Sequence, residues 1–457
     1  MEWTQGTAVN LTISSLTNRG DGIGHVDGRA VFVPDTVPGD EVLAKLVRVK
    51  SSHAFGSLKR VLTPSDDRIR PACILAQKCG GCQWQPVGYD AQLAAKDQLV
   101  TDALTRLGHL ERGHLERIGV APILAAPAAL HYRNKVSYPI AKGTTQPLKV
   151  GYFRKGSHKL VNVNQCPVQD ERLDTVLQTV KQDLQSTDWP AYNERNQKGE
   201  LRHLGLRIGR RTGQLLITLV AKTDRLPGLD TLAKVWMQTI PNLQGVCLNI
   251  NPKRTNAIFG QETQLVAGTH ELQEEFAGLT ISIDSTSFFQ VYTEQAERLL
   301  NWVSSQLTLK GNETLIDAYC GIGTLTLPLA KRVKQAIGIE VIPNAVQQAN
   351  RNAKLNGIDN VAFVEGTVEE MLPSLPAADV VLLDPPRKGC ERSVLDILMQ
   401  RTPATLVYIS CNPATLARDL DVLVNNGPFS LDTYQTADFF PQTAHVETAA
   451  ILHLADQ

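Results

Sequence analysis

Cysteine is sparse in this chain, and long apolar runs are missing. The 457 residues include 8 Cys, too few for a disulfide-dense scaffold, and the composition excludes a collagenous chain. No window approaches about 18 consecutive apolar residues, so we expect neither a transmembrane helix nor a membrane partner. The N-terminus has no basic segment followed by an apolar core, so we expect no secretory signal. These absences predict a cytoplasmic protein whose cysteines stay reduced.

Net charge, internal repeats and low-complexity tracts are also missing. The chain carries 46 Lys and Arg against 46 Asp and Glu, with 42% hydrophobic and 20% charged residues. This composition excludes wholesale disorder, and the length predicts roughly two to four domains. Global neutrality does not exclude local patches of one sign.

Two segments concentrate positive charge. The first, residues 131–160, contains no Asp or Glu and carries Arg133, Lys135, Lys142, Lys149, Arg154, Lys155 and Lys159. The second consists of Arg202, Arg207, Arg210 and Arg211. Aromatic residues are interleaved in the first segment, namely Tyr132, Tyr138, Tyr152 and Phe153. Cations mixed with aromatic rings favour a surface that binds RNA or another polyanion, whereas the alternative is an ordinary solvated face.

The first 60 residues are predicted to form a small β-barrel. Short strands at Ala8–Leu16, Ala30–Val33 and Glu41–Val49 alternate with turns rich in glycine and proline, and no helix interrupts them. Barrels of this kind often bind RNA or oligonucleotides.

Residues 61–280 are predicted to form a central α+β domain. A helix is expected over residues 89–110, with an apolar side made of Leu93, Leu99, Leu104 and Leu107. Further elements are expected at Val136–Ile140, Asp170–Leu184, Leu215–Val220 and Gly245–Ile250.

Residues 281–457 alternate strands and helices, which predicts an α/β domain with a doubly wound, Rossmann-like and mostly parallel sheet. The predicted strands are Glu313–Tyr319, Ala336–Glu340, Val361–Glu365, Asp379–Asp384 and Thr405–Ser410. A ligand of such a sheet lies at the carboxyl ends of its strands.

Three features meet at that edge of the predicted sheet. The segment 317–323 (DAYCGIG) follows the first strand, and its glycines allow close approach of the backbone to a ligand. Glu340 ends the second strand, where a carboxylate can bind ribose hydroxyls, and the segment 384–387 (DPPR) follows the fourth strand. Because Thr326 occupies the third position of a GxGxxG pattern, the combination favours S-adenosylmethionine over NAD.

A candidate nucleophile and a candidate base lie in the same domain. Cys411 follows the strand Thr405–Ser410 and precedes a predicted helix at Ala414–Leu423, whose N-terminus is expected to lower the pKa of the thiol. His445 and Glu447 are candidate acid/base groups. The alternatives are a buried structural cysteine and ordinary surface or capping residues.

A thiolate and a base beside a methyl donor suggest methylation of uracil at carbon 5. That carbon is not nucleophilic until a thiolate adds to carbon 6, and a base must then remove the carbon-5 proton. A uracil in structured RNA must also leave its stack to reach such a pocket.

The segments 384–389 (DPPRKG), 408–413 (YISCNP) and 445–447 (HVE) resemble the RNA uracil-5-methyltransferase family in order and spacing. Residues 287–290 (SFFQ) look like the stretch that opens the catalytic domain in that family, and the predicted barrel looks like a TRAM domain. The resemblance implies that Cys411 is the nucleophile and that Glu447 removes the carbon-5 proton.

The resemblance also implies residues that contact the cofactor or the target base. These are Gln290, Tyr319, Glu340 and Asp384, with Thr367 as a further candidate. Thr324 falls where many relatives carry Asn, so its assignment departs from the family pattern.

Four cysteines form a candidate metal site. Cys73, Cys79 and Cys82 lie close in sequence, and Cys166 lies far downstream. Four thiolates suit zinc or a [4Fe–4S] cluster, and the spacing is not that of a zinc ribbon. Resemblance to the ribosomal-RNA branch of the family implies a [4Fe–4S] cluster. We expect this cluster to fasten the linker and to present residues 131–160 to RNA.

The leading hypothesis is therefore a monomeric methyltransferase that acts on carbon 5 of uridine in 23S ribosomal RNA. The alternatives are the same chemistry on the T-loop uridine of tRNA, a non-catalytic RNA-binding protein fastened by a metal, and a methyltransferase of exocyclic amino groups that uses DPP but needs no cysteine.

Overall fold

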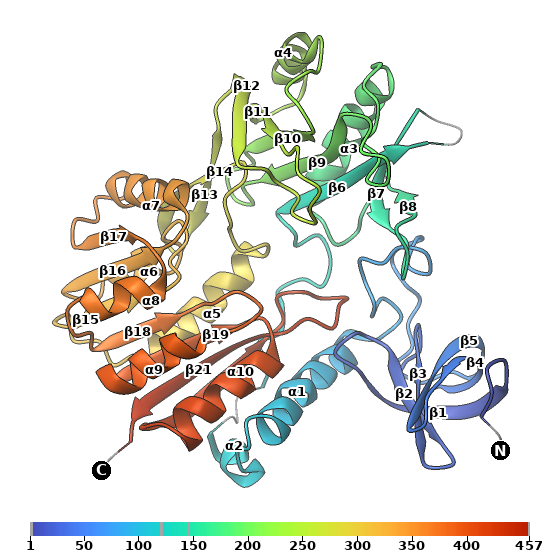
Figure 1. Ribbon diagram of the computed structural model, residues 1–457, viewed down its shortest axis with the longest axis horizontal. Coiled ribbons are helices and arrows are strands. Elements are labelled where there is room, and N and C mark those ends of the chain that lie inside the picture. Colours follow the sequence, from blue (N-terminus) through green and yellow to red (C-terminus); the bar gives the residue numbers. More distant parts are fainter. Residues whose placement is uncertain (1–2, 119–121, 144–146, 456–457) are drawn as a thin grey trace.

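The computed structural model describes residues 3–118, 122–143 and 147–455. It contains a closed five-stranded barrel, two seven-stranded sheets and a two-stranded ribbon. Figure 1 shows the long helix α1, Tyr89–Arg106, between the barrel (blue) and the C-terminal sheet (orange to red), with the central sheet (teal to yellow-green) at the top of the view. Within the described residues, no helix combines the length and apolar character needed to cross a membrane.

The predicted N-terminal barrel is confirmed. Its strands are β1 (Ala8–Leu16), β2 (Gly22–Val26), β3 (Arg29–Val33), β4 (Glu41–Val49) and β5 (His53–Thr63). They close in the order β1-β2-β3-β5-β4. The prediction named three of these five strands and missed β2 and β5, the last of which extends past the predicted boundary at residue 60. Along β1, every second side chain from Val9 to Ile13 points into a core of small aliphatic residues, as the alternation of polar and apolar residues requires.

Helix α1 connects the barrel region to the rest of the chain, and its buried face differs from the prediction. The predicted apolar side included Leu107, which is half exposed and lies just beyond the helix. The buried positions are Gln92, Lys96, Val100 and Leu104. Two polar side chains, Gln92 and Lys96, thus occupy the buried stripe because each has a hydrogen-bonding or charged partner elsewhere in the chain. The short helix α2, Arg112–Ile118, follows.

The central domain is built on an open sheet in the order β12-β11-β10-β9-β6-β7-β8. Its strands are β6 (Lys135–Lys142), β7 (Leu148–Phe153), β8 (Leu160–Asn162), β9 (Leu201–Ile208), β10 (Leu215–Ala221), β11 (Leu243–Ile250) and β12 (Glu262–Gly268). Helices α3 (Glu171–Gln185) and α4 (Leu229–Thr239) pack on it and bury their apolar faces in a shared core. The three-residue strand β8 forms one edge of the sheet.

The ribbon β13 (Glu271–Phe276) and β14 (Leu279–Asp284) leads into helix α5 (Thr293–Gln306) and the C-terminal sheet. The parallel strands of that sheet are β15 (Thr314–Asp317), β16 (Gln335–Glu340), β17 (Val361–Glu365), β18 (Val380–Leu383) and β19 (Thr405–Ser410). Helices α6 (Thr326–Ala330), α7 (Pro343–Leu355), α8 (Val368–Met371), α9 (Arg392–Arg401) and α10 (Pro413–Leu420) connect them, with a 3-10 turn at Leu372–Ser374 and a π-helical turn at Asp421–Asn425.

Two strands of this sheet are absent from the prediction. β20 (Phe429–Ala437) and β21 (Glu447–Leu454) extend the sheet in the order β17-β16-β15-β18-β19-β21-β20. Since β21 runs antiparallel to β19, its first residue lies at the edge where the parallel strands end.

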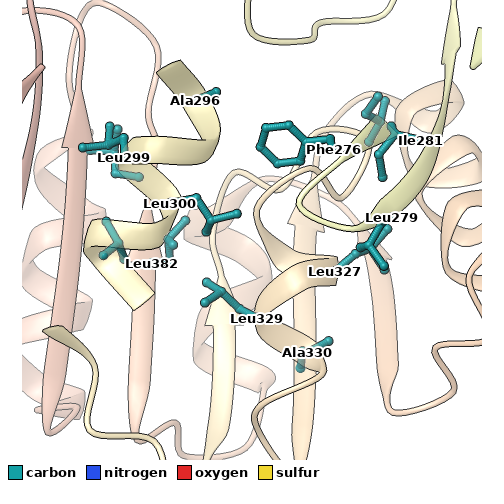
Figure 2. Close-up of a cluster of buried hydrophobic side chains, with 14 of the residues drawn as sticks. Phe276, Leu279, Ile281, Ala296, Leu299, Leu300, Leu327, Leu329, Ala330 and Leu382 are labelled. Carbon is teal, nitrogen blue, oxygen red and sulfur yellow. The ribbon is translucent and has the colours of Figure 1, made fainter. Parts of the chain in front are cut away.

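A large apolar core lies on one side of the C-terminal sheet. Figure 2 shows side chains from the ribbon, α5, α6 and β18 meeting there, among them Phe276, Leu300, Leu327 and Leu382. Full burial of a Leu or Phe side chain contributes about 1.5–3 kcal/mol. This packing fixes the strand ends on which the candidate site lies.

A buried ion pair joins α1 to the loop between β20 and β21. The Nζ of Lys96 lies 2.5 Å from Oδ1 of Asp438, and both side chains are fully buried. Lys96 also donates a hydrogen bond to the carbonyl oxygen of Phe440. On the preceding turn of the helix, Gln92 and Gln442 exchange two further hydrogen bonds. These contacts hold the loop that leads to Glu447.

We expect Lys96→Met to lower the free energy of unfolding by about 3–5 kcal/mol, because the Asp438 carboxylate is then buried without a cation. The double variant Lys96→Met/Asp438→Asn should recover part of the loss. The measurement is the midpoint of urea unfolding, with Lys234→Met on an exposed face of α4 as the matched control. Equal midpoints for Lys96→Met and Lys234→Met would contradict this role.

Candidate active site

The carboxyl ends of the parallel strands bring most of the predicted site residues to one edge. Asp317 ends β15, Glu340 ends β16, Asp384 follows β18 and Cys411 follows β19. Glu447 begins β21 at the same edge. The topology confirms that the 317–323 turn, Glu340, Asp384 and Cys411 share one edge, and it adds Glu447, whose strand the sequence analysis did not predict.

Strand register places Cys411 beside Glu447. Ser410 of β19 pairs with Thr448 of β21, so the next residues on the two antiparallel chains are Cys411 and Glu447. The Glu447 carboxylate is one cause of the raised pKa of the Cys411 thiol. The two candidate catalytic groups are therefore neighbours across a strand pair.

The pKa of the Cys411 thiol is raised to about 11, opposite to the predicted lowering. Burial is the largest cause, and the carboxylates of Glu447 and Asp384 add to it. The N-terminus of α10 does not offset these effects, although Asn412 caps that helix by accepting a hydrogen bond from the N–H of Ala414. In the free protein the thiol is protonated at neutral pH.

Three carboxyl groups at this edge have raised pKa values. Burial raises the pKa of Asp317 to about 6, although the Thr326 hydroxyl donates a 2.6 Å hydrogen bond to its carboxylate. Burial and the charge of Asp317 raise the pKa of Asp384 to about 7. Burial and the charge of Asp384 hold the pKa of Glu447 well above its ordinary value. Raised carboxyl pKa values in a crevice are typical of acid/base sites.

Arg387 supplies positive charge to this acidic group. Its guanidinium lowers the pKa of both Cys411 and Glu447. The guanidinium also lies 3.0 Å from Nδ1 of His445, and it helps burial lower the pKa of His445 to about 4. His445 is therefore neutral at pH 7, and Arg387 is a functional candidate that the sequence analysis left inside the DPPR motif without a role.

The first turn of the sheet leaves room for a ligand. Gly321 and Gly323 have left-handed backbone conformations, with φ of +54° and +85°, which favour glycine. A Cβ at Gly321 would meet no atom within 4 Å, so open space lies before this turn. Glu340 accepts hydrogen bonds from the N–H groups of Gly321 and Ile342, which fixes its carboxylate beside that space.

Donor and acceptor groups at this edge fit the polar parts of S-adenosylmethionine. Within the described residues, the side chains of Asp384 and Gln290 make no hydrogen bond, so both are free to bind a ligand. Glu340 offers a carboxylate of the kind that binds ribose hydroxyls. Val341 and Ile342 follow it as exposed apolar residues suited to a flat ring, and the sequence analysis missed both.

The other predicted cofactor residues lie nearby but differ in their contacts. Tyr319 directs its hydroxyl to the sulfur of Cys390, 3.8 Å away. Thr367 caps α8, and the preceding Gly366 donates a backbone hydrogen bond to Glu340. Thr324 lies in the turn after Gly323.

A cleft of about 1280 Å³ leads from the barrel to Cys411. Barrel residues such as Arg19 and Phe32 line it together with the exposed face of α1, Arg387, Cys411 and His445. Cys411, the candidate nucleophile, is therefore accessible from the side of the barrel.

Phe288 is 64% exposed, and the Nζ of Lys135 lies over its ring. It is a further candidate for stacking on a base, and the sequence analysis did not give it a role.

The two basic segments have different environments. In the second, three of the four arginines pair with carboxylates inside the protein: Arg202 with Glu194, Arg210 with Asp170 and Glu294, and Arg211 with Glu297. The fourth, Arg207, is buried and donates to the carbonyl oxygen of Ser287. This cluster is structural, so its prediction as a polyanion surface was wrong. The first segment keeps exposed cations at its end.

The four cysteines of the candidate metal site lie close to one another. Burial raises the pKa of Cys82 to about 11 and that of Cys166 to about 12, and the other cysteines contribute to both values. The described residues nevertheless include no group of three or more His, Cys, Asp or Glu placed to hold a metal ion. Four thiols suit a metal by their chemistry, so the [4Fe–4S] assignment stays a prediction.

Comparisons with known proteins agree with this arrangement. The family model of tRNA (uracil-5-)-methyltransferases matches residues 89–455, and the TRAM domain model matches residues 2–59. An RNA methyltransferase of Nostoc sp. is 54% identical over 99% of this chain and 98% of its own length. An RNA methyltransferase of Halalkalibacterium halodurans is 38% identical, over 98% and 97%.

A solved structure is similar along the whole length. The tRNA (uracil-54, C5)-methyltransferase of Pyrococcus abyssi, in complex with S-adenosyl-L-homocysteine, has a TM-score of 0.78 and 27% identity. The match covers 97% of this chain and 99% of that chain.

We expect alkylation of Cys411 by iodoacetamide to accelerate about tenfold per pH unit between pH 7 and pH 9, because the reactive thiolate is a minor form below the thiol pKa. Glu447→Gln should speed the reaction by removing a negative charge that raises this pKa, and Arg387→Gln should slow it. Peptide-level mass spectrometry separates Cys411 from the other cysteines. A rate that is independent of pH over this range would refute the raised pKa.

Proposed function

Because this chain belongs to the tRNA (uracil-5-)-methyltransferase family, we propose that it methylates carbon 5 of specific uridines in 23S ribosomal RNA, with S-adenosylmethionine as methyl donor. The observation that carries the proposal is the pair Cys411 and Glu447, adjacent across β19 and β21 at the end of an RNA-sized cleft.

Cys411 acts first, as the nucleophile. Its thiol loses a proton to solvent, and the sulfur forms a bond to carbon 6 of the uracil. The electron pair of the carbon 5–carbon 6 double bond moves into the carbon-4 carbonyl, which makes carbon 5 nucleophilic. Arg387 favours the ionised thiol, because its charge lowers the pKa of Cys411.

Glu447 acts second, as the general base. After the methyl group is attached, the Glu447 carboxylate takes the proton from carbon 5, the double bond re-forms and the bond between carbon 6 and sulfur breaks. A carboxylate with a raised pKa is a stronger base at neutral pH. Burial and Asp384 create this condition.

Residues at the strand ends supply the place for the methyl donor. Glu340 would bind the ribose, the turn at Gly321 would accommodate close approach of the ligand, and Asp384 and Gln290 would bind polar groups of the donor or of the target base. Tyr319, Thr324 and Thr367 are further contacts implied by the family. When bound, S-adenosylmethionine supplies an electrophilic methyl group on a sulfonium.

The cleft supports RNA as the substrate. It joins the TRAM barrel to Cys411, so a strand bound at the barrel can reach the nucleophile. A uracil must be unstacked to enter, and exposed aromatic side chains such as Phe288 can stack on a base that has left its helix.

One observation favours ribosomal RNA as the substrate, and another favours tRNA. The cysteine loop supports ribosomal RNA by resemblance to that branch of the family. The Pyrococcus abyssi enzyme favours tRNA, and its match over 97% of this chain includes the barrel, so the barrel does not discriminate between the two targets.

We expect Glu447→Gln to trap a covalent protein–RNA adduct, because release of Cys411 requires removal of the carbon-5 proton. Cys411→Ala should form no adduct and should abolish turnover. The measurement is a denaturing gel after incubation with the methyl donor and either transcribed 23S ribosomal RNA or transcribed tRNA, followed by mass spectrometry of the attached nucleotide.

An adduct with ribosomal RNA alone supports the proposed target, and an adduct with tRNA alone replaces it. Full activity of Cys411→Ala would reject the mechanism and favour methylation of an exocyclic amino group. Cys247→Ala, at a buried cysteine in β11 of the central sheet, is the matched control and should still turn over.

We also propose that Cys73, Cys79, Cys82 and Cys166 bind a [4Fe–4S] cluster. Their proximity and burial support the proposal. Zinc requires four ligand atoms about 2.0–2.3 Å from one ion, whereas the thiolates of a cluster stand farther apart because each binds a different iron. The spacing of these cysteines in the sequence is not that of a zinc ribbon, and resemblance to the ribosomal-RNA branch of the family favours a cluster over a single ion.

Protein purified without oxygen should contain about four irons per chain and show the brown colour of a cluster, with little zinc. Cys79→Ser/Cys82→Ser should lose the iron, and Cys247→Ser/Cys320→Ser should keep it. Metal analysis and visible absorption provide the readout. One zinc and no iron per chain would replace the cluster by a zinc site.

A further inference from the structure

A second hollow lies on the central domain, at the edge of the sheet formed by β6, β7 and β8. It has a volume of about 500 Å³ and a floor of Ala141, Leu160 and Val161. Its rim consists of cationic side chains from four chain segments, namely Lys78, Lys142, Lys149, Arg154 and Lys159. We call it the basic hollow.

The charge of the basic hollow is not neutralised by the protein. No Asp or Glu lines it. Among the described residues, none of its five cations forms an ion pair. By contrast, the neighbouring Lys155 pairs with Asp35 of the barrel at 3.1 Å. Like charges gathered around one concavity repel one another, so an anionic ligand would relieve this repulsion.

An exposed aromatic ring adjoins the basic hollow. Phe153, next to the lining residue Arg154 in the chain, is 45% exposed and has the ring of His158 edge-on against it. Exposed aromatic rings beside cations suit nucleic acid, because bases stack on the rings while the cations hold phosphates. A small inorganic anion would use only the charge.

Backbone contacts fix the basic hollow relative to the cysteine loop. Cys79 and Arg154 form a β-bridge. Gly80 donates to the carbonyl oxygen of Phe153, and Lys155 donates to that of Lys78. Figure 1 shows the end of the sheet at β7 and β8 next to the segment that joins the barrel to α1. The hollow therefore lies on the barrel-facing side of the central domain.

The basic hollow is separate from the cleft that reaches Cys411, since the two share no lining residue. We propose that it binds backbone phosphates of the substrate RNA outside the nucleotide that enters the cleft. This inference rests on the proposed function for the identity of the RNA. It adds a binding site that acts through affinity and leaves the chemistry unchanged.

The test replaces the exposed cations together, in Lys142→Ala/Lys149→Ala/Arg154→Ala/Lys159→Ala of the full-length protein. The dissociation constant for a transcribed ribosomal RNA domain should rise on the order of tenfold or more, and the slope of log affinity against log salt should fall by about 2–4. For methylation, KM should rise with kcat unchanged, whereas KM for a short hairpin around the target uridine should stay the same.

The matched control is Lys234→Ala/Lys310→Ala/Lys331→Ala/Lys334→Ala, which removes equal charge from exposed positions elsewhere. Equal affinity and salt slope in the two quadruple variants would overturn the proposal. Binding is measured directly, so it can be judged even if the wild-type protein methylates neither RNA.

A third measurement separates RNA from other anions. At constant ionic strength, inorganic phosphate should compete with the RNA no better than chloride does if the hollow binds an extended backbone. Selective competition by phosphate, or a loss of binding to anionic vesicles with RNA affinity unchanged, would replace RNA as the ligand.

Discussion

The ion pair between Lys96 and Asp438 is the contact on which the catalytic edge depends. Both side chains are fully buried, so their attraction offsets the cost of desolvation only while α1 and the loop after β20 hold the two charges in contact. On one side is α1, whose other face lines the cleft, and on the other is the loop that delivers Glu447 to the edge of the sheet. The same helix also packs on α10, which begins just after Cys411. One helix thus contacts the elements that position Glu447 and Cys411, the proposed base and nucleophile, and also lines the cleft.

The sequence was sufficient for the elements whose pattern is local. Three of the barrel strands, β1, β3 and β4, and the parallel strands follow from alternation and from buried apolar runs, whereas β2 and β5 were missed. The positions of Asp317, Glu340, Asp384 and Cys411 follow from topology. Helix α1 shows where local pattern fails, because Gln92 and Lys96 occupy its buried stripe and only their distant partners, Gln442 and Asp438, make that burial favourable. The partners lie more than 300 residues away in the chain.

Contacts between residues far apart in the chain also explain the other differences between prediction and structure. β20 and β21 have no helix between them and complete the sheet as an antiparallel pair, which a search for alternating strands and helices does not find. The arginines 202–211 look like an RNA surface until their carboxylate partners are in place, which are contributed by α5, by Asp170 before α3 and by Glu194 before β9. The pKa of Cys411 depends on burial and on Glu447 and Asp384, so the neighbouring helix N-terminus alone predicted the wrong direction.

The net charge of zero conceals a spatial separation between acidic groups at the candidate site and basic groups on the central domain, and the proposed reaction on RNA requires this separation. The edge that holds the candidate site collects Asp317, Glu340, Asp384 and Glu447. Whichever of these carboxyl groups are ionised repel RNA phosphates, although the pKa values of three of them are raised. Cations placed directly among these groups would attract the backbone, but they would also lower the carboxyl pKa values and weaken Glu447 as a base. Arg387 already has this effect on Glu447. The RNA site proposed in the basic hollow would place further cations outside the cleft that reaches Cys411, because the hollow and the cleft share no lining residue.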